Sequence, residues 1–238
     1  MKFEKIYILV LFLLIVLLNI NNLNLPYYWD DFNYVIPAVD HVYKTTPTLF
    51  LWEYGLGHPP FFFNLAGIIF KIFGDYTFVG HLIIIIFSFL TALFTYFLGK
   101  ELFSRKIGII ASLLLVFTPI FVSYSSLLYL EMPLTALVVM SVYFAVKNKP
   151  WLSVIFGSLA VLTKEIGIVA VLGIFLAKLI KYRKTKTLIY GIPILTFLLL
   201  MTLNKIHYGY FIFPASSDLI NIIFGQLALI YLPLIKRN

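Results

Sequence analysis

Residues 1–23 read MKFEKIYILVLFLLIVLLNINNL, a basic start followed by an apolar core from Ile6 to Leu18. A transmembrane helix needs about 20 mostly apolar residues, and this stretch is long enough to supply them. A secretory signal peptide has a similar pattern, but a small-residue cleavage motif follows its core. No A-x-A pattern follows Leu18, so we expect a retained first membrane helix.

The composition of the whole chain is that of a membrane protein. Of its 238 residues, 62% are hydrophobic and 12% are charged, whereas soluble domains carry about 25% charged residues. The apolar runs comprise residues 6–23, 78–99, 107–124, 132–146, 151–163, 166–180, 188–203 and 219–235. We therefore expect an all-α fold, a polytopic transmembrane bundle of about eight spans, two of them short. It would form a single membrane domain over residues 1–238, without a soluble domain.

The net charge of +8 is explained by topology. Cytoplasmic loops of membrane proteins are enriched in Lys and Arg. With the N-terminus in the cytoplasm, most of the 18 basic residues fall in cytoplasmic connections, and all four histidines fall outside. We predict a multi-pass protein of the cell membrane with both termini cytoplasmic, which binds membrane lipids and no nucleic acid. The absence of cysteine excludes disulfides and thiolate chemistry.

Residues 151–180 form either one long helix or two short ones. Basic segments flank them, KNKP before and KYRKTK after. If both segments are cytoplasmic, the chain must go out and come back, which predicts two helices of about 13–15 residues. The tip TKEIG (163–167) would then sink into the outer leaflet among protein groups, with Lys164 near the depth of the lipid phosphates.

The long connection 24–77 is predicted to lie outside the membrane. Its stretch PPFFFNLAGIIFKIFG (59–74) is apolar but too short to span, and one helical face carries Asn64, Gly67 and Lys71. We expect a helix in the plane of the interface, with Lys71 extending towards the headgroups.

Ionisable side chains gather on this predicted outer face. Charges at membrane depth are costly unless they are paired or functional, so their gathering predicts a site. They are Asp30 and Asp31 in YYWDDFNY (27–34), His58 in GHPPFF, Glu131 in YLEMPL, and Lys164 with Glu165 in LTKEIG.

The adjacent carboxylates Asp30 and Asp31 have two interpretations. They could cap a helix that starts near Phe32. Alternatively, one is a general base whose pKa is raised by desolvation, while the other positions substrate or a metal ion. Neighbouring side chains on a helix point about 100° apart, which favours two different roles.

The other candidates also have simpler interpretations. His58 fits an ordinary loop histidine, Glu131 fits a helix-start charge, and Lys164 could pair with Glu165 or with bulk headgroups. The carboxylates and His58 are also ligands for a hard cation or zinc. Nothing in their spacing requires a metal, so a divalent metal stays an open option.

The order of these motifs resembles the polytopic GT-C glycosyltransferases. The closest branch is the dolichyl-phosphate-mannose protein mannosyltransferase type, with the lipid A aminoarabinose transferases as relatives. The resemblance covers most of residues 1–180, from the acidic pair through GHPPFFFNLAGIIFKIFG to GSLAVLTKEIG. The second acid is Asp31, where the mannosyltransferases usually have Glu, and family members are commonly longer.

This resemblance implies an inverting transferase at the extracytoplasmic face. It would take a sugar from a polyprenyl-phosphate lipid and transfer it to a hydroxyl of a protein, lipid or glycan acceptor. On the matching positions, Asp30 and Asp31 are catalytic, with Asp30 as the base. His58 and Glu131 contact substrates, and Lys164 holds the donor phosphate, where an ammonium stabilises the charge of the leaving group.

Two other functions fit the same charges. A small transporter or lipid flippase would use them as a substrate path, but such proteins have corresponding broken helices in both halves, and here one hairpin occurs. A non-catalytic membrane subunit derived from the transferase core would act with a partner subunit and would need no functional Asp30.

Overall fold

The computed structural model describes residues 2–51, 53–55, 57–74, 77–182 and 185–209. All of the regular elements in these ranges are helices, which confirms the expected all-α class. The chain divides into two compact units, residues 1–198 and residues 199–238. Helix α10 (Ile192–Tyr208) begins in the first unit and continues into the second.

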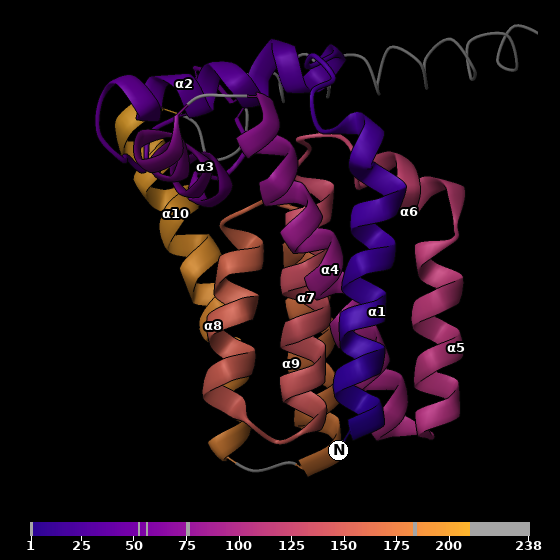
Figure 1. The fold of residues 1–238 in the computed structure, drawn as a ribbon. Coiled ribbons are helices and arrows are strands. Elements are labelled where there is room, and N and C mark those ends of the chain that lie inside the picture. Colours follow the sequence, from indigo (N-terminus) through magenta and orange to yellow (C-terminus); the bar gives the residue numbers. More distant parts are fainter. Residues whose placement is uncertain (1, 52, 56, 75–76, 183–184, 210–238) are drawn as a thin grey trace, which may run out of the picture. The chain divides into compact units, whose positions relative to one another are not determined.

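The helices of the first unit follow one another through mostly short connections (Figure 1). Before α10 they are α1 (Lys2–Asn19), α2 (Ile36–Lys44), α3 (Phe61–Phe73), α4 (Thr77–Leu102), α5 (Arg105–Val116), α6 (Pro119–Tyr124), α7 (Glu131–Val146), α8 (Pro150–Val161) and α9 (Gly167–Tyr182). A π-helical turn, Asp31–Val35, leads into α2, and 3-10 turns occupy Ile20–Asn22 and Thr185–Gly191.

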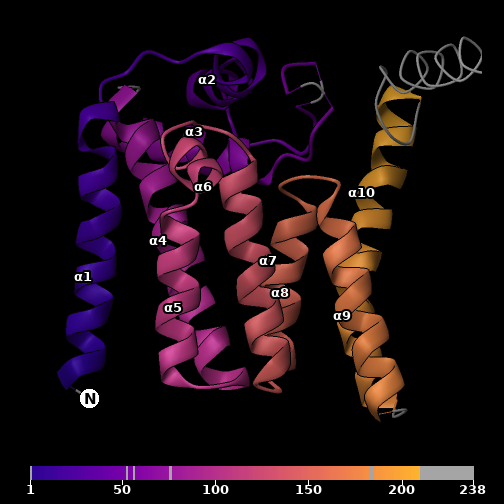
Figure 2. The ribbon, with the colours of Figure 1, turned by 90° about the vertical axis from the view of Figure 1, so that its right-hand side faces the viewer.

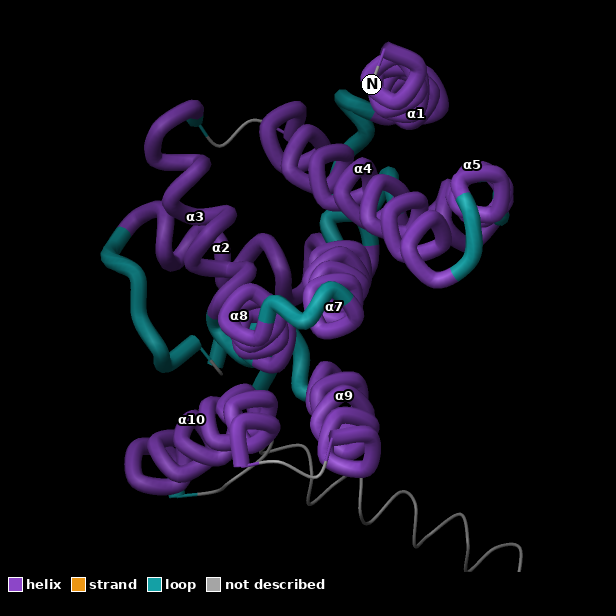
Figure 3. Tube along the Cα trace, turned by 90° about the horizontal axis from the view of Figure 1, so that it is seen from below, coloured by secondary structure: helices purple, strands orange, loops and turns teal. Residues whose placement is uncertain are grey.

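Helix α4 lies at the centre of this unit. It packs against α1, α3, α5 and α7, and α7 in turn packs against α8 and α9 (Figure 3). Helices α2, α3 and α6 lie at the end of the bundle opposite the N-terminus (Figures 1 and 2). The α4–α5 and α7–α8 connections lie at the same end as the N-terminus. The connections predicted to be cytoplasmic and those predicted to be extracytoplasmic are therefore at opposite ends.

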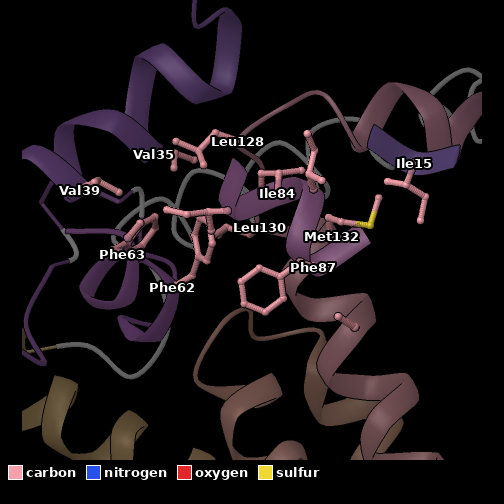
Figure 4. Close-up of a cluster of buried hydrophobic side chains, with 14 of the residues drawn as sticks. Ile15, Val35, Val39, Phe62, Phe63, Ile84, Phe87, Leu128, Leu130 and Met132 are labelled. Carbon is pink, nitrogen blue, oxygen red and sulfur yellow. The ribbon is translucent and has the colours of Figure 1, made fainter. Parts of the chain in front are cut away.

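A cluster of buried apolar side chains holds the segments at the α2–α3 end together (Figure 4). Burial of apolar surface contributes about 25 cal/mol per Å². Because Val35 follows Asp31 by four residues and Leu130 precedes Glu131, this core fixes the backbone that carries both acids. The labelled members are Ile15, Val35, Val39, Phe62, Phe63, Ile84, Phe87, Leu128, Leu130 and Met132.

Among the described residues, three helical stretches are long and apolar enough to cross a membrane: Phe3–Asn22, Thr77–Leu102 and Thr185–Tyr208. Helices α3, α7 and α8 are apolar but shorter. The predicted total of about eight spans therefore stays a prediction, and the expected last span, residues 219–235, lies outside the described residues.

The expected single run 107–124 is wrong, because two helices replace it. Helix α5 ends at Val116 and α6 begins at Pro119. Proline lacks an N–H and disfavours helical geometry in the residue before it. Thr118 accordingly has a ψ of 135°, in the extended region.

The predicted hairpin is confirmed, because α8 ends at Val161 and α9 begins at Gly167. The helix expected at 59–74 is present as α3, but its polar face contacts protein. The Thr48 amide donates to Asn64 Oδ1 over 3.0 Å, and the Lys71 ammonium donates to the Thr45 carbonyl. Lys71 therefore holds the segment after α2 instead of extending freely towards headgroups.

The hairpin turn depends on close approach at Gly167. A Cβ there would lie 2.8 Å from the Ala160 carbonyl oxygen, whereas a Cβ on Gly173 of the same helix would meet nothing within 4 Å. We expect Gly167→Ala to destabilise the protein by about 1–3 kcal/mol. The control Gly173→Ala should stabilise it by about 0.5–1 kcal/mol. Thermal unfolding in detergent measures both, and equal melting temperatures for the two variants would contradict this packing.

Candidate active site

The acidic pair has two different environments. Asp31 begins the π-helical turn and is 1% exposed, and its Oδ2 accepts the Leu128 amide over 3.2 Å. Its Oδ1 is buried without a hydrogen-bond partner among the described residues. Asp30 is exposed, and its Oδ2 accepts the Tyr34 hydroxyl over 3.4 Å. The Asp30 side chain makes no capping hydrogen bond, so capping does not account for it.

Burial raises the pKa of the Asp31 carboxyl to about 7. The Leu128 amide opposes this rise, while the negative charges of Asp30 and Glu131 add to it. Burial and the same two charges raise the pKa of the Tyr34 phenol. Tyr34 is therefore a hydroxyl donor to Asp30, and Asp31 exchanges its proton near neutral pH.

The loop before α3 places His58 beside the hairpin. Gly57 has a φ of +81°, in the region that favours glycine. Two prolines follow His58, and the Phe61 amide then donates to the Leu162 carbonyl over 2.8 Å. This link brings His58 Nδ1 to 2.9 Å from Glu165 Oε2, with its ring centroid 5.5 Å from that of Tyr34.

Lys164 pairs with Glu131, not with its neighbour Glu165. The Lys164 ammonium lies 2.5 Å from Glu131 Oε1, and the local Lys164–Glu165 pair considered from the sequence is absent. Glu131 is the first residue of α7, and its Oε2 is buried without a hydrogen-bond partner among the described residues. Burial acts to raise the pKa of Glu165, but the hydrogen bond and charge of His58, together with the Glu165 backbone amide and the nearby charge of Lys164, lower that pKa.

All six ionisable residues singled out from the sequence thus lie in one group: Asp30, Asp31, His58, Glu131, Lys164 and Glu165.

Two members of the group were missed, Tyr34 and Tyr129. Tyr34 follows Asp30 by four residues, the spacing at which side chains meet on a helix, so this contact had a sequence signal. Tyr129 comes from the non-helical segment before α7, where no sequence signal indicated its contact with the acidic pair. Burial raises the pKa of Tyr129, and a hydrogen bond with the Asp30 backbone opposes the rise.

The described residues contain no group of three or more His, Asp or Glu side chains placed to hold a metal ion. The group at this end of the bundle instead combines carboxylates with one ammonium and phenolic donors. Such a set can remove a proton from a hydroxyl and bind an anion.

A cavity of about 330 Å³ adjoins this group. Helices α4 to α7 line it, mainly with apolar side chains that include Leu115, Phe121 and Met132. Glu131 also lines it, so the cavity connects the ion pair with an apolar space.

One known family model matches most of the chain. The family model described as dolichyl-phosphate-mannose-protein mannosyltransferase matches residues 57–208. The matched part contains His58, Glu131 and Lys164, whereas Asp30 and Asp31 precede it. No curated protein and no solved structure matches the chain.

The raised pKa of Asp31 predicts a pH-dependent stability. A folded-state pKa of about 7 against a usual 3.8 favours the protonated form in the fold. Its contribution is complete below about pH 4 and is lost as the pH rises through about 7. Asp31→Asn should therefore reduce the fall in melting temperature between about pH 4 and 7, because the wild type loses up to about 1.4 kcal/mol of stability for each pKa unit between the two values. Asp40→Asn, at an exposed carboxylate on α2, should keep the wild-type profile, and an unchanged profile in Asp31→Asn would refute the assignment.

Proposed function

Because the chain belongs to the dolichyl-phosphate-mannose-protein mannosyltransferase family, we propose that it transfers a sugar from a polyprenyl-phosphate lipid to an acceptor hydroxyl. The family implies a membrane glycosyltransferase in general. The proposal rests on one observation: the exposed carboxylate of Asp30 and the ammonium of Lys164 belong to one group of side chains at one end of the bundle, and this group adjoins an apolar cavity.

Asp30 is the proposed base. It is the exposed member of the acidic pair, so an acceptor hydroxyl can reach its carboxylate. The Tyr34 hydroxyl orients this carboxylate by a hydrogen bond. The buried Asp31 carboxylate accepts the Leu128 amide, and this hydrogen bond fixes the turn from which Asp30 projects.

Lys164 is the proposed phosphate ligand. In the structure it is held by Glu131, and its side chain is 18% exposed, so an incoming phosphate can contact the ammonium. The pair fixes the position of the ammonium before the donor arrives. The His58–Glu165 bond also holds the hairpin tip, and His58 is the further proposed substrate contact.

The reaction that follows is a displacement with inversion. Asp30 takes the proton of the acceptor hydroxyl, and the hydroxyl oxygen forms a bond to the anomeric carbon. The bond between that carbon and the phosphate oxygen breaks, and the polyprenyl phosphate leaves with the bonding electron pair. The Lys164 ammonium stabilises the negative charge that develops on the phosphate.

The proposed orientation follows the charges. The group around Asp30 and Lys164 would face the extracytoplasmic side, and the basic end with the N-terminus would face the cytoplasm. The acceptor class, whether protein, lipid or glycan, is left to the assay.

The first test is sugar transfer in membranes with a panel of polyprenyl-phosphate sugars. Asp30→Asn removes the base and should lower the rate about 10²- to 10⁴-fold. Lys164→Ala removes the phosphate ligand and should lower it about 10²- to 10³-fold. Asp40→Asn and Lys44→Gln, which break an exposed pair on α2, should retain wild-type rates at matched expression.

Two results would count against the proposal. Wild-type rates in both site variants would remove Asp30 and Lys164 from the reaction. No transfer by the wild type with any donor would favour a non-catalytic subunit, and movement of intact donor across the bilayer would favour a flippase.

A second test concerns the polyprenyl chain, which we place in the cavity beside Glu131. Thr135→Phe narrows this cavity and should raise the KM for long-chain donors more than for short-chain donors. Leu114→Phe is the control, because Leu114 is exposed on α5 and does not line the cavity. An equal KM change for both chain lengths would place the chain elsewhere.

A further inference from the structure

Lys178 on α9 is a buried cation at the basic end of the bundle, far along the helix from the hairpin tip. It is 9% exposed. Its ammonium donates to Asn148 Oδ1 over 2.9 Å and lies 5.2 Å and 5.3 Å from the ring centroids of Tyr182 and Tyr190. An ammonium carries three donors, and the described residues give this one a single hydrogen-bond acceptor.

Neighbouring lysines at this end have carboxylate partners. Lys100 lies 2.6 Å from Glu4, and Lys147 lies 3.0 Å from Glu101. Lys178 is more buried than either, yet its partners in the described residues are an amide and two aromatic rings. Buried charges are normally paired, and within the described part of the chain no carboxylate pairs with Lys178.

Two cavities flank this ammonium. One of about 280 Å³ is mainly apolar, with Val142, Val146 and Ile174 in its wall. The other, of about 290 Å³, is lined by Lys186 and Tyr190 among others. Both share Lys178, Asn148 and Tyr182, and the described residues that line them include no carboxylate.

Lys181 adds a second cation to the apolar cavity. Its ammonium lies 5.3 Å from the Tyr182 ring centroid, so both cations face the same aromatic side chain. The cavities therefore combine positive charge, hydrogen-bond donors and an adjoining apolar wall. A ligand that matches all three features has an anionic head and a hydrocarbon chain.

We propose that this pocket binds the phosphate headgroup of an anionic membrane lipid. The phosphate would contact Lys178 and Lys181, and an acyl chain would occupy the apolar cavity along α7 and α9. A free phosphate shares the headgroup chemistry but lacks the chain, so the apolar cavity favours the lipid.

The test uses the full chain purified in detergent. Phosphatidylglycerol should raise its melting temperature in a saturable way, and phosphatidylcholine and inorganic phosphate should raise it less at equal concentration. Lys181→Gln changes an exposed residue and should raise the half-saturating concentration about fivefold, the equivalent of about 1 kcal/mol per basic residue. Lys178→Gln should abolish the shift, and Lys147→Gln should leave it as in the wild type.

Three outcomes would overturn the proposal. Equal shifts with phosphatidylglycerol and phosphatidylcholine would remove headgroup recognition. A full shift with inorganic phosphate would assign the pocket to a free anion. Equal losses in Lys181→Gln and Lys147→Gln would attribute binding to general surface charge instead of this pocket. Lys181→Gln keeps the test valid if Lys178→Gln does not fold.

Discussion

The candidate site depends on two ion pairs that Lys164 and Glu165, neighbours at the hairpin tip, make with different segments. These neighbours have opposite charges, yet each pairs with a distant segment, Lys164 with the start of α7 and Glu165 with His58. Leaving a partly buried charge unpaired costs several kcal/mol. A shift of the tip towards one partner would therefore break the ion pair with the other partner. Three segments that are far apart in sequence are fixed around one point.

The acidic pair shows how adjacent residues obtain different roles from one backbone turn. If Asp30, Asp31 and Glu131 were all ionised, three negative charges would face an anionic donor. Burial holds the pKa of Asp31 at about 7, so this carboxyl is largely protonated below neutral pH. The net charge near the site is then less negative, and Asp30 is left as the exposed carboxylate of the acidic pair. Desolvation of one acid would thus favour both the proposed base and the proposed binding of a phosphate.

Much of the architecture follows from one-dimensional patterns. Basic flanks on both sides of 151–180 favoured a hairpin over one long helix, and α8 and α9 have that form. The break before Pro119 was also readable from the ring chemistry of proline, although apolar continuity across 107–124 concealed it. Charge alone indicated which residues would gather at one end. It did not indicate the pairing, because the choice of Glu131 over Glu165 by Lys164 depends on the direction of α7.

The two proposed anion sites differ in how an anion would bind. At Lys164 an incoming phosphate would compete with Glu131, so binding would exchange one anion for another, and part of the attraction would be cancelled. Exchange suits a substrate, which has to leave after each turnover. At Lys178 no carboxylate of the described lining residues would have to be displaced, so an anion would add to the site and neutralise a buried charge. Addition suits a lipid that stays bound, and this difference would separate a reacting lipid at one end of the bundle from a resident lipid at the other.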